Sequence, residues 1–381
     1  MRIARILTRL NLGGPARQAL ASDPWLQARG HELRVFVGEP EAGEGDLAQE
    51  LAAQGVSVVR VPGMGRQVRP WADARARRFL VSALREYAPD LVHTHASKAG
   101  ALGRRAAWKL GLPTVHTFHG HVLAGYFPAP VSWILRRVEA RLARGTTRVL
   151  AVSQATAQDL VSFGVLPAER IHLQPPGVVL DGFGQPDQGA GSLRGPLGIP
   201  AEALVVGVIG RLAEVKRPCL ALESFAIAAQ QEPRLHLVYV GDGAERGKLE
   251  AAAARLTEEV ARRVHLAGPR ERMGGVYQDL DLVLGASRSE GLPVAFIEAG
   301  AAGLPVVSTP VGGVPELVEH GRTGVLAEDA RGLAAGLLEL AQEPGKRHTM
   351  GGLARERALE RHSAAALGAG LEAHYRQVLG R

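Results

Sequence analysis

Residues 287–300, SRSEGLPVAFIEAG, follow the apolar run DLVLGA and read as the turn and helix of a strand–turn–helix unit. Backbone N–H groups around Gly291, Leu292 and Val294 lack helical partners at such a helix start, and they favour a phosphate there. Gly291 leaves room for a ligand to approach the backbone, and Pro293 suits the beginning of a helix. The turn therefore predicts an anion site at the end of a strand.

A carboxylate stands on each side of this predicted anion site. Glu290 precedes the helix and Glu298 lies inside it, eight positions later. An anion would repel both carboxylates unless each of them binds neutral hydroxyl groups instead. A nucleotide sugar meets that condition, because a ribose and a transferred hexose flank its diphosphate.

The same alternation of apolar runs and helix-like stretches continues along the chain in two series. The first series of predicted strands covers residues 2–7, 32–37, 56–61, 91–95, 114–118 and 149–153, with helical patterns such as 16–27 and 75–87 between them. The second series covers residues 204–209, 236–240, 264–266, 280–284 and 305–308. This alternation predicts parallel sheets covered by helices on both faces, which is the doubly wound α/β architecture.

A stretch rich in glycine and proline separates the two series. It predicts an N-terminal domain over residues 1–176, a linker over 177–200 and a second domain over 201–362. Sheets of this kind bind ligands beyond the carboxyl ends of their strands, so two such domains facing each other predict a central cleft.

Two cations follow the first predicted strand of the second domain. Arg211 can bind two phosphate oxygens at once, and Lys216 adds a point charge. Either residue alone reads as a solvated surface charge. Together with the predicted helix start, the pair indicates a clamp for a diphosphate.

These motifs resemble those of the GT-B glycosyltransferases of family 4, which are retaining enzymes. The resemblance rests on EGLPVAFIE, with Glu290 and Glu298 as an E-x7-E motif, on GRLAEVKRP, and on GLPVVSTPVGGVPELVEHGRTGVL. In the first half, LNLGGPARQAL, HTHASKAGALGRRAA and VHTFHGHVLAGYF are similar to bacterial members that build surface polysaccharides. The resemblance implies two Rossmann-like domains, and a C-terminal helix in residues 363–381 that crosses back to the first domain. One departure is PPG at residues 175–177, where many relatives carry Pro-Asn-Gly.

The resemblance implies a role for each matching residue of the second domain. Arg211 and Lys216 would hold the donor diphosphate. Glu298 would bind the ribose hydroxyls, and Glu290 would bind hydroxyls of the transferred sugar. The rest of the implied donor site is Gly291, Leu292 and Pro293, with Arg270 placed where the family contacts the base.

In the first domain, the resemblance implies a glycine loop and a histidine near the donor. Gly13 and Gly14 match the family's loop beside the phosphate, although paired glycines also form simple turns. His119 matches the histidine near the sugar, where it would bind a hydroxyl or steady developing charge. The implied catalytic group is therefore His119, Glu290, Arg211 and Lys216.

The histidines also allow a rival interpretation as a metal site. His93 with His95, and His119 with His121, each place two imidazoles at the end of a predicted strand. No carboxylate accompanies them, and Lys98 would repel a cation. We therefore expect no metal and no other cofactor.

Two further patterns imitate known sites. Gly241 and Gly243 imitate a nicotinamide-binding fingerprint, but the third glycine is one residue late, so a strand-to-helix turn is the better interpretation. Asp279 and Asp281 imitate a metal-binding carboxylate pair. Because Asp281 begins a strand at its amino end, opposite the ligand edge, a structural role is favoured.

The charge is uneven along the chain. Residues 1–176 hold 23 basic and 13 acidic residues, whereas the remainder holds 22 and 25. Residues 131–144, VSWILRRVEARLAR, read as an amphipathic helix with arginines beside an apolar stripe. We expect the stripe to pack on the sheet and the arginines to stay available to an anionic membrane or a lipid diphosphate. Scattered, solvated arginines are the alternative.

The motifs and the resemblance together imply a metal-independent transferase of class EC 2.4 that moves a sugar from a nucleotide sugar, most simply a UDP-sugar. Retention is implied by the resemblance alone. The expected acceptor is a glycan or a lipid-diphosphate-linked acceptor in cell-surface polysaccharide synthesis. The alternatives are a GDP-mannose-type mannosyltransferase, and a nucleotide-sugar hydrolase or epimerase on the same fold. Only 4% of the residues are aromatic and no basic recognition helix is evident, which disfavours a nucleic-acid partner.

The single cysteine, Cys219, excludes an intrachain disulfide and favours a reducing compartment. Met1 leads directly into a predicted strand, so no secretory leader is expected. The predicted location is the cytoplasm, with peripheral association at the inner face of the cell membrane.

Overall fold

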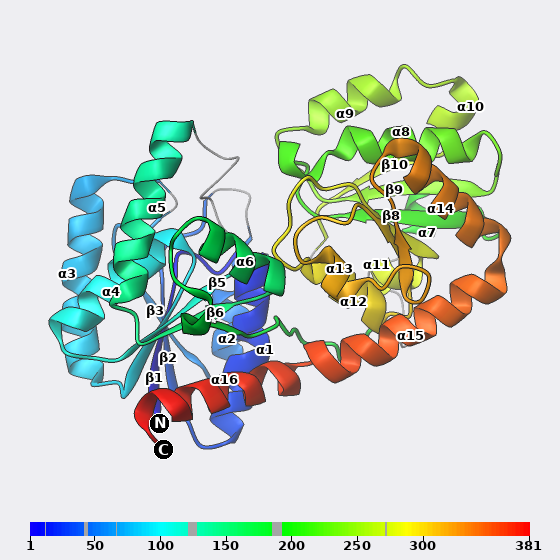
Figure 1. Cartoon of the computed structure of the whole chain (residues 1–381). Coiled ribbons are helices and arrows are strands. Elements are labelled where there is room, and N and C mark those ends of the chain that lie inside the picture. Colours follow the sequence, from blue (N-terminus) through cyan, green and yellow to red (C-terminus); the bar gives the residue numbers. More distant parts are fainter. Residues whose placement is uncertain (12, 42–44, 66, 121–127, 185–192, 271–272) are drawn as a thin grey trace. The chain divides into compact units, whose positions relative to one another are not determined.

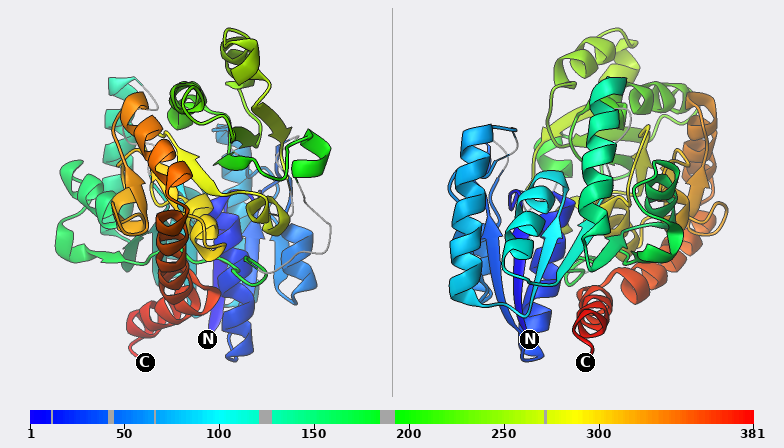
Figure 2. Two further views of the ribbon diagram at one scale, coloured as in Figure 1. Left: turned by 90° about the vertical axis from the view of Figure 1, so that its right-hand side faces the viewer. Right: turned by 60° about the vertical axis from the view of Figure 1, so that its left-hand side comes forward.

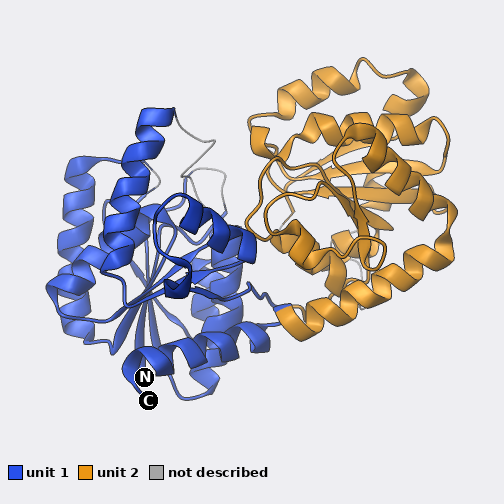
Figure 3. Cartoon of the chain, viewed as in Figure 1, with its two compact units in different colours: residues 1–179, 362–381 blue, residues 180–361 orange. Residues whose placement is uncertain are grey.

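A computed structural model divides the chain into two compact units, residues 1–179 with 362–381 (unit 1) and residues 180–361 (unit 2), as coloured in Figure 3. The structure describes residues 1–11, 13–41, 45–65, 67–120, 128–184, 193–270 and 273–381. Unit 1 continues to residue 179, three residues beyond the expected domain. The expected linker is divided between the two units, and its residues 185–192 lie outside the described residues.

Unit 1 contains a wholly parallel sheet, whose described strands have the order β3-β2-β1-β4-β5-β6-β7 (Figure 1). The strands are β1 (Arg2–Leu7), β2 (Glu32–Val37), β3 (Ser57–Arg60), β4 (Leu91–His95), β5 (Thr114–Phe118), β6 (Arg148–Ala151) and β7 (Ile171–Leu173). The central strands β1, β4 and β5 are buried along almost their whole length, polar residues included, because helices cover both faces of the sheet.

The helices of unit 1 form a layer on each face of this sheet. They are α1 (Gly14–Ala28), α2 (Ala48–Ala53), α3 (Pro70–Tyr87), α4 (Ser97–Lys109), α5 (Ala129–Arg144), α6 (Gln154–Ser162) and α16 (Ala364–Leu379), with a 3₁₀ turn, η1 (Ala168–Arg170). One core cluster joins α1, α2 and α16 to the sheet, and a second joins α3 and α4 to it. The two ends of the chain lie side by side in unit 1 (Figures 1 and 2).

Unit 2 repeats the architecture with a parallel sheet in the order β10-β9-β8-β11-β12-β13 among its described strands. These are β8 (Leu204–Ile209), β9 (Leu235–Val240), β10 (Val264–Gly268), β11 (Leu282–Gly285), β12 (Val306–Ser308) and β13 (Gly324–Leu326). The helical elements are α7 (Arg194–Leu197), η2 (Glu214–Lys216), α8 (Pro218–Ala229), α9 (Arg246–Ala253), α10 (Glu258–Ala261), α11 (Gly274–Gln278), α12 (Val294–Ala301), α13 (Val314–Leu317), α14 (Ala330–Gln342) and α15 (Pro344–His362). The predicted pair of doubly wound units is confirmed.

Helix α16 completes the core of unit 1. Leu367, Leu371 and Tyr375 are buried in the cluster that covers β1, β2 and α1. Gly368 permits close contact with α1, since a Cβ atom there would lie 2.3 Å from the ring of Trp25. The Tyr375 hydroxyl lies 2.6 Å from Nδ1 of His93 on β4. The final helix is thus part of the same fold as the first strand.

The expected orientation of helix α5 is only partly right. Leu142 of its apolar stripe is 2% exposed and Leu135 packs on a core cluster, but Val131 is 42% exposed, Ile134 54% and Val138 38%. The side that faces the protein also carries Glu139, whose Oε1 lies 2.5 Å from Nη2 of the buried Arg104 on α4. A buried guanidinium without its carboxylate would cost several kcal/mol, so this ion pair helps to set the rotation of the helix and leaves three residues of the stripe outside.

Candidate active site

A pocket lies at the carboxyl edge of the sheet in unit 2, where the strand order reverses. Strand β8 pairs with β9 on one side and with β11 on the other, so the loops after β8 and β11 leave the sheet in opposite directions. Such a switch point is the usual ligand site of an open parallel sheet. The lining residues include Gly210, Arg211, Leu212, Lys216, Gly285, Ser287, Glu290, Pro293 and Phe296.

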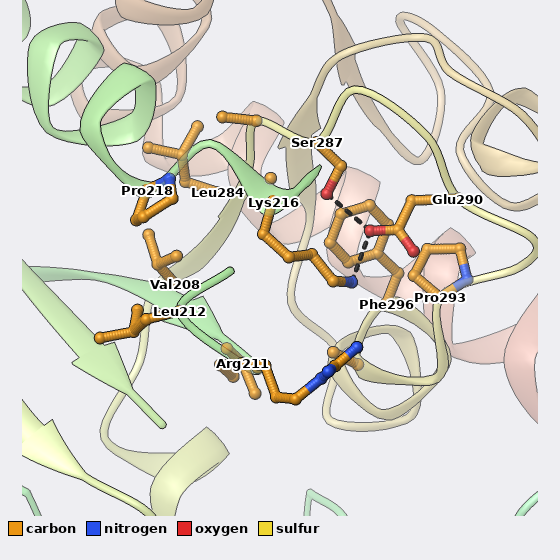
Figure 4. A pocket seen from close by; sticks show the side chains of 15 residues that line it. Val208, Arg211, Leu212, Lys216, Pro218, Leu284, Ser287, Glu290, Pro293 and Phe296 are labelled. Atoms are coloured by element: carbon orange, nitrogen blue, oxygen red, sulfur yellow. Dashed lines mark hydrogen bonds and ion pairs between the residues drawn. The ribbon is translucent and has the colours of Figure 1, made fainter. Parts of the chain in front are cut away.

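Two side chains of the pocket converge on one carboxylate oxygen (Figure 4). Oε1 of Glu290 lies 2.5 Å from Nζ of Lys216 and 2.6 Å from Oγ of Ser287. The exposed side chain of Arg211 points toward the same space in Figure 4. The structure therefore brings together Arg211, Lys216 and Glu290, and it adds Ser287, to which the sequence interpretation gave no role. A hydroxyl three residues before Glu290 was the available signal.

Backbone contacts hold the two loops of the pocket together. Arg217 adopts a left-handed conformation at φ 47°, and its guanidinium donates to the carbonyls of Ala286 and Ser287 at 2.6 and 2.9 Å. The amide of Arg288 donates to the carbonyl of Val215 at 2.7 Å. The cation-bearing loop and the carboxylate-bearing loop are thus fixed to each other.

A third loop supports Glu290 from behind. The amide of Gly313 donates to the carbonyl of Gly291 at 3.0 Å. Gly312 has φ 54°, and a Cβ atom there would lie 1.8 Å from the carbonyl oxygen of Glu290. Only glycine allows that approach, which gives the glycine pair of GLPVVSTPVGGVPEL a physical role.

Glu298 lies deeper than Glu290 and does not line the pocket. It is 3% exposed on α12, and its Oε2 lies 2.9 Å from the hydroxyl of Tyr277. Helix α12 begins after Pro293, its N-cap residue, so the amides of its first turn lack helical partners. Gly291 and Leu292 precede that helix start and lie outside the pocket lining.

Arg270 lies apart from this cluster. It follows β10, the edge strand beside β9, at the carboxyl edge of the same sheet. Its neighbours 271–272 are outside the described residues.

Gly13, Gly14 and His119 belong to unit 1. Gly13 is the N-cap residue of α1 with φ −89°, so this turn does not require glycine for its backbone angles. The Gly13 amide donates to Oδ1 of Asn11 at 3.3 Å. His119 follows β5 and contacts α1 through Gln18, whose Nε2 lies 3.3 Å from its Nδ1.

His119 is engaged at both ring nitrogens. Its Nε2 lies 2.8 Å from Nδ1 of His95, and its Nδ1 faces Gln18. Burial, and after it the charge of Arg5, lowers the pKa of His119 to about 3, so the ring is neutral. The histidine expected near the sugar is therefore held by other side chains.

The histidine pairs do not assemble a metal site in the described part of the chain. His93 directs its Nδ1 to Tyr375 and its Nε2 to Thr117, at 2.6 and 2.8 Å. No group of three or more side chains suited to a metal ion occurs among the described residues. His121 lies outside them.

Both imitated sites have structural roles. Oδ2 of Asp281 accepts from the amide of Val205 at 2.8 Å and from Arg194 at 3.1 Å, which ties β11 to β8 and α7. Asp279 accepts from backbone amides at the start of α7. Gly241 has φ 144° and packs against the carbonyl of Gly210, as a strand-to-helix turn requires.

Comparison with known proteins assigns a family to both units. The model described as Glycosyltransferase Family 4 matches residues 12–181, and the model described as Glycosyl transferases group 1 matches residues 203–343. The chain is 30% identical over 340 residues to the D-inositol 3-phosphate glycosyltransferase of Streptomyces scabiei, a match that covers 84% of this chain and 72% of that protein. It is also 30% identical over 275 residues to the enzyme of the same name from Thermobispora bispora. That match covers 68% of this chain and spans only 63% of the relative's length.

Solved structures agree on the fold. The crystal structure of Anabaena Alr3699/HepE in complex with UDP and glucose superimposes with a TM-score of 0.84 at 24% identity, over 99% of this chain and 100% of that chain. WaaG, a glycosyltransferase involved in lipopolysaccharide biosynthesis, superimposes with a TM-score of 0.74 at 19% identity over both whole chains. The chain belongs to family 4 of the glycosyltransferases and has their GT-B fold.

Proposed function

We propose that this chain transfers a sugar from a nucleotide-sugar donor to an acceptor, with retention at the anomeric carbon and without a metal ion. One observation carries the proposal: the pocket at the switch point of unit 2 holds two cations, Arg211 and Lys216, around the carboxylate of Glu290. Cations beside a helix start suit a diphosphate, and a carboxylate in the same pocket suits the hydroxyls of a sugar.

The hydrogen bonds of the pocket support separate roles for Lys216 and for the two carboxylate oxygens of Glu290. An ammonium group has three donors, so Lys216 can keep Glu290 and still bind a phosphate oxygen. Oε1 of Glu290 receives both Lys216 and Ser287, which leaves Oε2 for a sugar hydroxyl. Stabilising the departing diphosphate then supplies the electrostatic part of catalysis, and the same diphosphate accepts the proton of the attacking hydroxyl.

The proposed donor is a UDP-sugar. Support comes from the Anabaena structure, which holds UDP and glucose. Glu298 and Arg270 are the proposed contacts of the ribose and the base, with Gly291 and Leu292 as proposed backbone contacts beside the pocket, ahead of the start of α12. A GDP-mannose-type donor, or hydrolysis or epimerisation of the nucleotide sugar, are the competing outcomes.

The proposed acceptor is anionic. Unit 1 holds 25 basic against 14 acidic residues, whereas unit 2 holds 20 against 24. A lipid-diphosphate-linked glycan of surface-polysaccharide synthesis fits this charge. A phosphorylated polyol fits it as well, in line with the relatives named for D-inositol 3-phosphate.

Thermal unfolding of the full chain with UDP, GDP, ADP and their sugars tests the donor. A nucleotide at 100 times its dissociation constant adds about 2.7 kcal/mol to the stability of unit 2, which raises its midpoint by several degrees. We expect UDP and a UDP-sugar to give that shift, and NMR of the product to show an unchanged anomeric configuration. No shift with any nucleotide at millimolar concentration would contradict the proposal, while UDP release without an acceptor would indicate a hydrolase.

We further propose that unit 1 docks on an anionic lipid bilayer at the cytoplasmic face of the membrane, through the starts of α3 and α5. Trp71 is 90% exposed at the start of α3, and Trp133 is 58% exposed beside the apolar stripe of α5. Both helices begin at the carboxyl edge of the same sheet, because each follows one of its parallel strands. The exposed arginines nearest these helix starts complement acidic headgroups; they are Arg75, Arg77, Arg78 and Arg137. No helix in the described ranges is long and apolar enough to cross a membrane.

Flotation with vesicles tests this docking surface. We expect the full chain to float with phosphatidylcholine vesicles that contain one third phosphatidylglycerol, and not with phosphatidylcholine alone. The double substitution W133S/I134S removes two exposed apolar side chains and should lower the bound fraction at least tenfold. Leu359→Ser on α15, where the side chain is 42% exposed in unit 2, is the matched control and should float like the unmodified chain. Equal flotation of both variants would rule out this surface.

A further inference from the structure

A line of polar side chains runs through the interior of unit 1 from Arg5 through His95 and His119. Arg5 on β1 and His95 at the end of β4 are no more than 2% exposed. NH1 of Arg5 lies 3.4 Å from Nε2 of His95, and Nδ1 of His95 lies 2.8 Å from Nε2 of His119. The line ends at Gln18 on α1. Strands β1, β4 and β5, which carry or precede Arg5, His95 and His119, are neighbours in the sheet.

The direction of these hydrogen bonds follows from Arg5. A guanidinium has five N–H donors and no acceptor, so Nε2 of His95 must accept. Asp23 holds Arg5 in place, with Nη2 of Arg5 2.8 Å from Oδ1 of Asp23. Arg5 can therefore act only as a donor toward His95. Burial first, and then nearby positive charge, lowers the pKa of His95 well below its ordinary value, so this ring is neutral. A neutral imidazole carries one proton, which for His95 lies on Nδ1.

The proton position of His119 follows in turn. Nδ1–H of His95 donates to Nε2 of His119, so the neutral ring of His119 carries its proton on Nδ1. That N–H faces Gln18, whose amide accepts through Oε1 after a half-turn about its last bond. If His119 donated to His95 instead, the proton of His95 would lie on Nε2 and would face an N–H group of Arg5. Rotating either side chain would not remove this clash of two donors. Gln18 is the end of the line that can adapt.

We propose that Arg5 and His95 are positioning residues that keep His119 neutral with its proton on Nδ1, so that His119 offers a hydrogen-bond donor and never a base. The inference rests on the proposed function in one respect, namely that His119 meets the substrate. An oxygen of the substrate that replaces Gln18 then receives the Nδ1–H. The deprotonation of the acceptor must come from another group, such as the departing diphosphate.

Long-range ¹H–¹⁵N correlation spectra of the full chain, labelled in the histidine rings, test the tautomers directly. We expect neutral Nδ1–H rings for both His95 and His119 at pH 7, assigned by the peaks that disappear in H95N and H119N. An Nε2–H tautomer or a charged ring at His119 would overturn the proposal. The spectra report the tautomers whether or not the chain transfers a sugar. A failure to transfer any sugar would refute the proposed function, and the test of the tautomers would remain valid.

Two substitutions of His95 distinguish a role in fixing the proton of His119 from a role in merely filling space. The amide nitrogen of Asn reaches the place of Nδ1, whereas that of Gln reaches the place of Nε2. H95N should therefore keep the Nδ1–H tautomer of His119 and retain at least a third of kcat. H95Q should give a mixture of His119 tautomers and lower kcat at least tenfold with little change in the KM of the donor. Equal kcat values for H95N and H95Q would refute the positioning role of His95. This conclusion would hold even if the unmodified chain showed the expected tautomers.

Discussion

Replacing Lys216 with alanine lowers kcat/KM for the nucleotide sugar by two to three orders of magnitude. The loss of one placed donor to a developing anion costs about 2.7–4 kcal/mol of transition-state stabilisation. Here the substitution also removes the partner of Glu290, whose Oε1 lies 2.5 Å from the ammonium. The carboxylate then faces the diphosphate without compensation, which adds to the loss.

Lys216 is one of only five lysines in the chain, and another provides the matched control. The side chain of Lys248 is 70% exposed on α9, and its Nζ pairs with Glu245 at 2.8 Å, outside the pocket. K248A should keep the full rate. K216R keeps the charge but replaces a point charge by a planar fork, so we expect an intermediate rate, about a tenth of the original. Initial rates over a range of donor concentrations, with circular dichroism as the check on folding, measure all three. A K216A rate within threefold of the unmodified chain would contradict the assigned site.

Below about pH 6, unit 1 loses stability at about 4 kcal/mol per pH unit. His93, His95 and His116 are no more than 2% exposed, and burial lowers the pKa of each well below its ordinary value. Burial also lowers the pKa of His119 to about 3. In the unfolded chain these four rings take up protons near pH 6.5. The unfolded state then binds four protons more than the folded state, which favours unfolding by about 1.4 kcal/mol per proton and pH unit.

Asp23 opposes this trend with one proton. Burial outweighs the charge of Arg5 and raises the pKa of Asp23 to about 6, above the value of 3.8 that the free side chain has. Between these two pH values the folded state holds a proton that the unfolded state releases, so three protons remain as the net difference. The stability of unit 1 is therefore complete above pH 6.5 and falls as the pH decreases.

Urea unfolding at pH 7.5, 6.5 and 5.5 measures the slope, and hydrogen exchange of peptides from each unit assigns it to unit 1. His116 provides the matched variant, since it titrates but lies outside the line that leads to His119; its Nδ1 contacts the hydroxyl of Thr94 at 2.8 Å. H116Q should reduce the slope by about 1.4 kcal/mol per pH unit, the share of one proton. A slope that is flat, or unchanged by H116Q, would show that the buried rings do not control acid stability.

The sequence predicted the strands that lie inside the sheets. β1, β2, β4, β5 and β8 have the expected limits, because a strand inside a covered sheet is short, rich in aliphatic and β-branched residues, and bounded by turn or helix patterns. The two strands it missed, β7 (Ile171–Leu173) and β13 (Gly324–Leu326), are three-residue edge strands. Each of these strands is too short to form a continuous buried apolar run, so the hydrophobic pattern does not reveal it.

The residues of the candidate site were predictable where each stands in a recognisable motif after a strand. Contacts between segments far apart in the sequence were not predictable. Arg211, Lys216 and Glu290 stand beside recognisable strand ends, which is why they could be grouped from sequence. The pairing of Glu139 with Arg104 joins residues 35 positions apart, and it left part of the expected apolar stripe of α5 exposed. The contacts of Arg5 and His95 span 90 positions. Local spacing holds no information about such pairs.

The return of the chain to its starting unit has a consequence for biosynthesis. Because α16 supplies Leu367, Leu371 and Tyr375 to the core around β1, unit 1 is discontinuous and unit 2 is inserted within it. A ribosome delivers every residue of unit 2 before it delivers α16. The nascent first unit must therefore wait with an uncovered apolar groove while the inserted unit already has its whole sequence, so the part of the protein that is made first is the last to be finished.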